Sequence, residues 1–361
     1  MDMDITFCTF FFDINRSNWD KFGIHSNTYM YWFNNVLSLD IKLHIQTEEK
    51  FVDIIREYRK KIDPEFKKTI IKISTIQQIE GWKRYNSQLE DLMYSDEFKQ
   101  KVYHDVPEMN KPLYNVLMFN KVHYLKQIIN ENPFDTQFFS WVDTGFIRDS
   151  SWVIDNEKWP VAEKIKLQEN KVRFFCINDT VEKGLAGTTK EEHCMSQMRY
   201  LKGTVFFLDK SCINELCDLF DKNANQCIAD KFIGSDEKIF DLCYCDNPDL
   251  FELVKCDWRQ EFHLYAEHNE KEYELNIEWD IDDIIDKQQE YDFWYIGIED
   301  STTAVIHRAD RNNNDHAEFL NFKKNQFTVK FQSTTIPHRV VIWPVDKDGK
   351  WMHRIEYPIK L

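Results

Sequence analysis

The stretch Phe138-Phe139-Ser140-Trp141-Val142-Asp143-Thr144-Gly145 decides how the first part of this chain is organised. Its mostly apolar run ends in a carboxylate, followed two positions later by a glycine, which predicts a buried strand that ends in a turn. Open α/β sheets bind ligands at the carboxyl ends of their strands, so we expect Asp143 at a ligand-binding edge. A carboxylate there can hold a divalent cation or accept a hydrogen bond from a sugar hydroxyl.

Strand-like and helix-like segments alternate around that stretch. Apolar strand patterns occupy residues 5–12, 41–46, 69–74, 137–143, 172–177 and 204–208, and helical spacing occupies residues 27–39, 51–61, 113–130 and 236–245. Fully apolar strands that alternate with helices imply a largely parallel sheet with both faces covered. We therefore predict a Rossmann-like α/β domain with a mixed, mostly parallel sheet over residues 1–268.

The pattern changes near residue 270 to short alternating segments without helices between them. These segments lie at residues 273–279, 293–298, 304–307, 326–331, 340–344 and 351–357, and turn-forming runs occur at 311–315 and 346–349. Short strands at even spacing are typical of an antiparallel sandwich. We predict a C-terminal antiparallel β-sandwich, an accessory domain over residues 269–361, with a linker near 267–271.

Composition narrows the class of partner. The chain has 46 Lys and Arg against 62 Asp and Glu, a net charge of −16, which argues against a nucleic-acid partner because phosphate contacts need a basic surface. The nine cysteines are scattered and form no zinc-type spacing, which favours reduced thiols. No signal peptide and no apolar run of ~20 residues is visible, so we expect a soluble, cytoplasmic protein without a transmembrane segment.

The helix at 113–130 precedes the Asp143 strand and carries Asn120 and Lys121. A lysine near that edge can neutralise phosphate, and the alternative for Lys121 is an ordinary solvated side chain. Gly145 belongs to the Asp-X-Gly turn that follows this strand.

The loop after the first strand reads Asp13-Ile14-Asn15-Arg16. Arg16 can bind a diphosphate in bidentate fashion, and Asp13 can accept from a base or a ribose. The alternative is a plain strand-to-helix turn with a surface arginine. A GxGxxG or P-loop motif is missing from the sequence, which argues against dinucleotide oxidoreductases and P-loop kinases.

An acidic pair stands at Gly234-Ser235-Asp236-Glu237, where a helix is expected to begin. Ser235 is a plausible N-cap, and one acid in the first turn is explained by the helix dipole. The other is then available for a sugar hydroxyl. The histidines fall in different segments, so no metal site can be inferred from their spacing.

Taken together, these motifs resemble the WlaTC/HtrL (YibB-like) family of bacterial proteins, which has a glycosyltransferase-A-type fold. The resemblance covers roughly residues 5–265. Its most specific part is Asn132-Pro133-Phe134-Asp135-Thr136 followed by the stretch quoted above. Where most metal-dependent members of this fold carry Asp-X-Asp, this chain has Asp-Thr-Gly, so one carboxylate is missing.

The resemblance implies a nucleotide-sugar donor, a divalent cation (Mn²⁺ or Mg²⁺) and a saccharide or glycoconjugate acceptor. It implies that Asp143 holds the metal or the donor sugar. The resemblance also implies that Asp13 and Arg16 face the nucleotide. Lys121 would bind the diphosphate or the donor sugar, with Asn120 and Gly145 beside it. Asp236 or Glu237 would act in catalysis on the acceptor side.

The sequence therefore predicts glycosyl transfer from a nucleoside diphosphate sugar, of the UDP type, in surface glycan synthesis. Retention and inversion of the anomeric centre both stay open, as do the donor sugar, the acceptor and the oligomeric state. One alternative is a non-catalytic carbohydrate-binding or adhesion protein, with sugar-stacking faces on Trp279, Trp294, Trp343 and Trp351. Another is a nucleotide-sugar hydrolase on the same scaffold.

Overall fold

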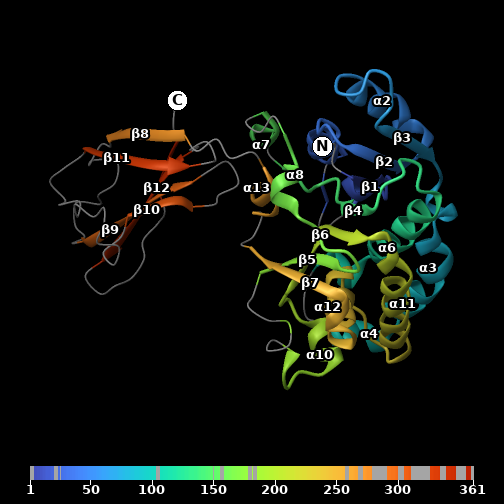
Figure 1. The fold of residues 1–361 in the computed structure, drawn as a ribbon. Helices are drawn as coiled ribbons and strands as arrows, with labels where there is room; N and C mark the ends of the chain where they lie inside the picture. Colours follow the sequence, from blue (N-terminus) through green and yellow to red (C-terminus); the bar gives the residue numbers. More distant parts are fainter. Residues whose placement is uncertain are drawn as a thin grey trace. The chain divides into compact units, whose positions relative to one another are not determined.

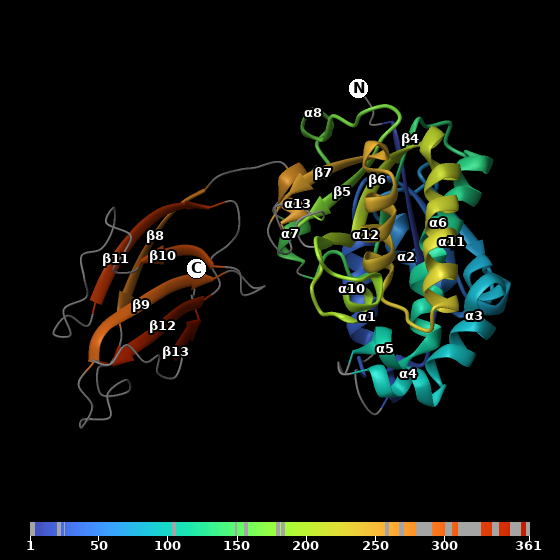
Figure 2. The same cartoon turned by 90° about the horizontal axis from the view of Figure 1, so that it is seen from below.

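The computed structural model describes residues 4–19, 23–24, 26–102, 106–148, 150–154, 158–177, 181, 185–256 and 260–266, and six strands beyond them. The chain forms two compact units, which divide at about residue 267. The first unit is a β-sheet with helices on both faces (Figures 1 and 2). The candidate site lies in this unit.

The sheet of the first unit has seven strands in the order β3-β2-β1-β4-β6-β5-β7. Strand β6 runs antiparallel to its neighbours β4 and β5, and the other pairings are parallel. This confirms the prediction of a mixed, mostly parallel α/β sheet. The strands are β1 (Ile5–Phe11), β2 (Lys42–Thr47), β3 (Thr69–Ile73), β4 (Phe138–Val142), β5 (Val172–Cys176), β6 (Leu201–Asp209) and β7 (Phe251–Lys255).

Helices cover both faces of the sheet. The α-helices are α1 (Ser26–Leu37), α2 (Val52–Lys60), α3 (Glu80–Met93), α4 (Asp96–Lys101), α5 (Pro107–Asn110), α6 (Pro112–Glu131), α7 (Ser151–Ile154), α8 (Ala162–Ile165), α10 (Lys190–Met195), α11 (Ile213–Ala229), α12 (Asp236–Asp246) and α13 (Glu261–Tyr265). Side chains of α3, α6, α11 and α12 share one apolar cluster, and those of α1 and α2 belong to another. Among the helices that the structure describes, none combines the length and the hydrophobicity needed to cross a lipid bilayer.

Strand β1 shows why the chain forms a two-faced layer. Ile5, Phe7 and Phe11 belong to the cluster on the α1 side, and Cys8 and Phe10 belong to the cluster on the α6 side. Side chains alternate between the two faces along a strand, so a continuous apolar run is buried on both sides. β1 is therefore an interior strand, paired with β2 on one side and β4 on the other.

The order of the sheet places two predicted site loops side by side. The chain proceeds from β1 outward to β2 and β3, then returns to add β4 on the opposite side of β1. Such a reversal creates a crevice outside the carboxyl ends of the two central strands. Because β1 and β4 are parallel neighbours, the loop with Asp13 and the turn with Asp143 lie at the same edge.

The second unit contains β8 (Lys271–Glu278), β9 (Tyr291–Glu299), β10 (Val305–Ala309), β11 (Gln326–Ser333), β12 (Arg339–Asp346) and β13 (Ile355–Pro358). They form a four-stranded sheet in the order β10-β9-β12-β13 and a pair of β11 with β8, and their pairings are antiparallel. The packing of these two sheets as a sandwich, and the domain limits, stay predictions. Trp279 and Trp351, most of the predicted linker and nearly all of the two turn-forming runs lie outside the described residues.

Candidate functional site

Asp143 follows β4 directly, and its backbone N–H donates to the Thr204 carbonyl at 2.8 Å. Its Oδ1 atom accepts from the Trp141 indole N–H at 2.6 Å and lies 2.9 Å from the Lys121 Nζ. Burial and the charge of Asp236 raise the pKa of Asp143, and Lys121 and Trp141 oppose that rise. The side chain is 25% exposed. Asp143 is thus a carboxylate that Trp141 and Lys121 hold through Oδ1, and part of its side chain still reaches the surface.

Lys121 is buried on α6, with its side chain only 2% exposed. Its Nζ lies 2.9 Å from Asp143 Oδ1 and 2.8 Å from Asp236 Oδ2, and it donates to the Gly203 carbonyl at 2.8 Å. The ammonium thus donates one hydrogen bond to a carbonyl and lies at ion-pair distance from two carboxylate oxygens. Burial alone would lower the pKa of Lys121, but the two carboxylates raise it above its ordinary value. The solvated lysine considered as an alternative is therefore wrong.

Asp236 and Glu237 stand in the first turn of α12, where Ser235 occupies the N-cap position without a side-chain capping hydrogen bond. Asp236 faces Lys121, and Glu237 Oε1 accepts from the Gly203 N–H at 3.1 Å. A Cβ at position 203 would lie 2.7 Å from Asp236 Oδ2 and 3.2 Å from Glu237 Cγ. The absence of a side chain at Gly203 is what lets both acids approach β6.

An arginine extends this group of charges. Arg199 Nη1 lies 3.3 Å from Glu237 Oε2, and Arg199 Nη2 donates to Glu108 Oε1 at 3.0 Å. Burial raises the pKa of Glu237 to about 7, with a further contribution from Asp236, although Arg199 acts in the opposite direction. A carboxyl group with such a pKa can take up or release a proton near neutral pH.

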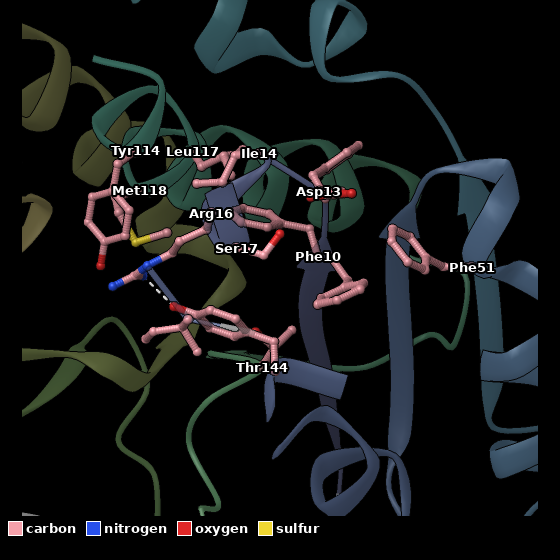
Figure 3. Close-up of a pocket in the computed structure, with 14 residues that line it drawn as sticks. Phe10, Asp13, Ile14, Arg16, Ser17, Phe51, Tyr114, Leu117, Met118 and Thr144 are labelled. Atoms are coloured by element: carbon pink, nitrogen blue, oxygen red, sulfur yellow. Dashed lines mark hydrogen bonds between the residues drawn. The ribbon is translucent and has the colours of Figure 1, made fainter. Parts of the chain in front are cut away.

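A pocket lies beside this edge, between the loop after β1 and the first half of α6 (Figure 3). Its lining is mainly aromatic and aliphatic and includes Phe10, Phe12, Tyr29, Tyr114, Leu117 and Met118. Its volume is about 100 Å³, small beside the roughly 300–1,000 Å³ of typical small-molecule sites. This volume is too small for a whole nucleotide-sugar.

Arg16 is the one cation among the described residues that line this pocket. Its guanidinium donates to the Tyr29 hydroxyl and lies 5.4 Å from the ring centres of Trp19 and Tyr29 and 5.3 Å from that of Tyr114. Aromatic faces attract a cation at such distances. Figure 3 shows Arg16 beside Tyr114 and Met118. Arg16 is therefore a half-buried, oriented side chain and not a plain surface arginine.

The pocket and the charged cluster are neighbouring parts of one site. Burial raises the pKa of both Tyr29 and Tyr114, and the acids add to this effect. The charge of Asp143 raises the pKa of Tyr29, and the charge of Asp236 raises the pKa of Tyr114. Thr144, which follows Asp143 directly, also lines the pocket.

Two further predicted residues lie at the margin of the site. Asp13 lines the pocket, but its Oδ2 is 3.0 Å from Lys50 Nζ and its Oδ1 accepts from the Asn15 N–H at 2.8 Å. Partial burial opposes ionisation of Asp13, but these contacts prevail and lower its pKa. A Cβ on Gly145 would meet only the Trp32 ring, at 3.5 Å, so nothing nearby requires a glycine there.

Asn120 is the predicted residue that the structure does not bring to this cluster. Its Oδ1 accepts from the Gly81 N–H at 2.9 Å, where α3 and α6 cross so closely that a Cβ on Gly81 would lie 2.6 Å from the Val116 carbonyl. Neighbouring positions on a helix point about 100° apart, so Asn120 and Lys121 face different partners. Asn120 fixes a helix crossing instead.

Several participants in the site were missing from the sequence-based prediction. Trp141 orients Asp143, Arg199 pairs with Glu237, and Tyr29 and Tyr114 surround Arg16. Trp141 has a local signal, because residues two apart on a strand share a face and Trp141 is two positions before Asp143. Arg199 and Tyr114 have none, since their partners are distant in the chain.

The predicted divalent cation finds a poor set of ligands at Asp143. Mg²⁺ and Mn²⁺ prefer several oxygen ligands at close range. Here Oδ1 of Asp143 already accepts from Trp141 and contacts Lys121, and Asp236 faces the same ammonium. In the part of the chain that the structure describes, no group of three or more His, Cys, Asp or Glu side chains is arranged to hold a metal ion. The cation stays a prediction.

Comparison with known families agrees with the resemblance seen in the motifs. A family described as "Bacterial protein of unknown function (HtrL_YibB)" matches residues 3–267, which include the whole cluster. The chain belongs to the HtrL/YibB family. One relative is Protein HtrL of Escherichia coli (strain K12). It is 22% identical over 270 residues, which cover 70% of this chain and 88% of the relative.

Two solved structures show weak likeness to this HtrL/YibB chain. The glycosyltransferase GlyE of Streptococcus pneumoniae TIGR4 aligns with a TM-score of 0.31 and 8% identity, over 70% of this chain and 45% of that one. PaToxG Glycosyltransferase aligns with a TM-score of 0.29 and 12% identity, over 68% of this chain and 70% of that one. The chain thus spans less than half of GlyE, and TM-scores this low do not establish a shared fold.

Proposed function

We propose that this protein is a glycosyltransferase of the glycosyltransferase-A type, which moves a sugar from a UDP-type nucleotide-sugar to a saccharide or glycoconjugate acceptor. The observation that carries the proposal is the contact of buried Lys121 with Asp143 next to an aromatic pocket that holds Arg16. A nucleotide-sugar has a planar base, two phosphates and a hydroxylated ring. This edge of the sheet offers a counterpart to each.

The donor would lie along the edge from the pocket to Asp143. Aromatic side chains provide stacking surfaces for a base, and the guanidinium of Arg16 matches phosphate oxygens in bidentate fashion. Asp13, which lines the same pocket, would accept from the base or ribose. The oriented carboxylate of Asp143 would accept from a hydroxyl of the donor sugar.

In the reaction, the bond between the anomeric carbon and the diphosphate oxygen breaks, and a bond from that carbon to an acceptor hydroxyl oxygen forms. The acceptor proton passes to a base, and Glu237 suits this role because its pKa is about 7. Arg199, with a side chain 36% exposed, would have to move aside for the acceptor. Asp236 would act by holding Lys121. Rate acceleration would then come chiefly from placing donor and acceptor together.

Acceptor stimulation separates the transferase from a nucleotide-sugar hydrolase. A hydrolase would consume donor at the same rate with and without saccharide, since water is its acceptor. For the transferase, synthesis of a surface glycan in the cytoplasm is the role that we propose.

The experiment is a thermal-shift panel of UDP-, GDP- and CMP-sugars, followed by donor-consumption assays with the ligand that binds. A ligand at a hundredfold excess over its Kd stabilises the folded form by about 2.7 kcal/mol. We expect Asp143→Asn to lower the rate of donor consumption by about 100-fold, as the loss of a preorganised polar group in an active site does. Asp53→Asn, on the exposed face of α2, is the matched control. Undiminished turnover in Asp143→Asn would remove Asp143 from the site.

A further inference from the structure

We propose that the Lys121 ammonium takes the place of a divalent metal ion in this site, so that the site binds its ligand without a metal. The identity of that ligand rests on the proposed function. The role of the Lys121 ammonium does not rest on it, because the contacts around Nζ support that role by themselves.

Three oxygens from three elements surround the ammonium. They are Asp143 Oδ1 at 2.9 Å, Asp236 Oδ2 at 2.8 Å and the Gly203 carbonyl at 2.8 Å. Carboxylate and carbonyl oxygens are the ligands that hard divalent cations select in proteins. These three oxygens therefore form a cation cage, and the ammonium of Lys121 occupies it.

The size of the cage suits an ammonium. Charge-assisted N–H···O contacts measure about 2.7–2.9 Å, and the three contacts of Lys121 lie at 2.8–2.9 Å. Mg²⁺ binds oxygen at about 2.0–2.1 Å and Ca²⁺ at about 2.3–2.6 Å. A metal ion would have to draw the oxygens inward by several tenths of an ångström and also expel a side chain that is 2% exposed.

The cage is also built into the packing of the domain. Lys121 comes from α6, Asp143 from the end of β4 and Asp236 from the first turn of α12. The missing side chain at Gly203 brings α12 close enough for Asp236 to reach the ammonium. Without a cation, the charges of buried Asp236 and partly buried Asp143 would be costly, and the side chain of Lys121 supplies the balancing charge. This leaves Asp143 to meet a hydroxyl and Arg16 to meet phosphate.

The test compares Mn²⁺ binding, followed by electron paramagnetic resonance, in the wild-type protein, Lys121→Ala, and Lys121→Ala combined with Asp143→Asn. Removing the ammonium leaves two carboxylates and a carbonyl around an empty volume. We expect no site-specific Mn²⁺ on the wild type, one Mn²⁺ per chain on Lys121→Ala, and loss of that ion in the double variant. Added Mn²⁺ should also raise the Tm of Lys121→Ala but not that of the wild type.

Two outcomes would overturn the proposal. One is a stoichiometric Mn²⁺ on the wild type that Asp143→Asn removes, since the metal and the lysine would then coexist. The other is a folded Lys121→Ala variant that binds no Mn²⁺, because the three oxygens would then not be a cation cage.

A wild-type measurement keeps the proposal testable if Lys121→Ala does not fold. The affinity for UDP, measured by calorimetry, should be the same within twofold in EDTA and in Mn²⁺. A tenfold or larger gain with Mn²⁺ would contradict metal-free binding. Failure of UDP, GDP and CMP to bind at all would sink the proposed function, and the Mn²⁺ results on the wild type would still decide the role of Lys121.

Discussion

The indole N–H of Trp141 donates to Oδ1 of Asp143 at 2.6 Å, from two positions earlier on the same strand. Residues two apart on a strand share a face, so the strand itself supplies the group that orients its terminal carboxylate. The same ring lies 5.6 Å from the Lys121 Nζ. Trp141 thus contacts both members of the ion pair.

We therefore expect Trp141→Phe to impair donor use through the position of Asp143. Loss of a hydrogen bond to a charged group costs roughly 1.5–3 kcal/mol, or about 10- to 150-fold in an equilibrium constant. The reduction should appear in kcat/KM for the donor. A positioning role also predicts that kcat falls more than KM rises.

Trp159→Phe is the matched control for this variant. Trp159 is also buried and donates from Nε1 to the Phe262 carbonyl at 3.0 Å, in the cluster on the other face of the sheet. It should lose a comparable amount of stability and keep kcat/KM. Equal kinetic losses in both variants would show that Trp141 acts through stability alone.

We expect alanine to affect stability differently at Gly203 and at Gly145. A Cβ at position 203 would lie 2.7 Å from Asp236 Oδ2, and a Cβ at 145 would meet only a ring carbon of Trp32, at 3.5 Å. Crowding of this kind costs about 1–3 kcal/mol. We expect Gly203→Ala to lower the free energy of unfolding by that amount and Gly145→Ala to change it little, as measured by urea denaturation. A neutral Gly203→Ala would mean that α12 can shift away from β6.

The elements that carry the site were largely predictable from local patterns. The apolar run before Asp143 forms β4, and the helical spacing at 113–130 forms α6 (Pro112–Glu131). The direction of β6 was not predictable, since an apolar strand has the same pattern whether it runs parallel or antiparallel. Helix α3 was missed, although Tyr85, Leu89 and Leu92 are buried at helical spacing.

The chemistry of the site depended on contacts that no local pattern contains. Lys121 is adjacent to Asn120 in sequence, yet one faces two acids and the other faces α3. The ion pair of Lys121 with Asp236 joins positions more than a hundred residues apart, and it exists because Gly203 leaves room. Residue types therefore indicated the candidate groups, and packing decided which of them meet.

Arg16 should control affinity for the nucleotide portion of the donor. Its guanidinium is placed among three aromatic rings, and only a planar, forked donor group retains both the stacking and a bidentate phosphate contact. We expect Arg16→Lys to weaken UDP binding about tenfold and Arg16→Ala to weaken it further, measured by calorimetry. Arg56→Ala, on the exposed face of α2, is the control. Unchanged UDP affinity in Arg16→Ala would separate the pocket from nucleotide binding.

Glu237 should make the stability of the fold depend on pH. Burial first, and then Asp236, raise its pKa from 4.5 to about 7, so the folded state holds a proton that the unfolded state releases. Its stabilising contribution is therefore complete below pH 4.5 and is lost as the pH rises to about 7. The change amounts to roughly 3 kcal/mol, at 1.36 kcal/mol per pKa unit.

Glu237→Gln removes this titration, so its free energy of unfolding relative to wild type should rise between pH 4.5 and 7.5. Urea denaturation at several pH values measures the difference, with Glu90→Gln on the exposed face of α3 as the control. If Glu237 also serves as the base, donor consumption by the wild type should increase as the pH passes through about 7. A difference between Glu237→Gln and wild type that stays constant with pH would show that Glu237 remains ionised in the folded protein, with Arg199 outweighing the effect of burial.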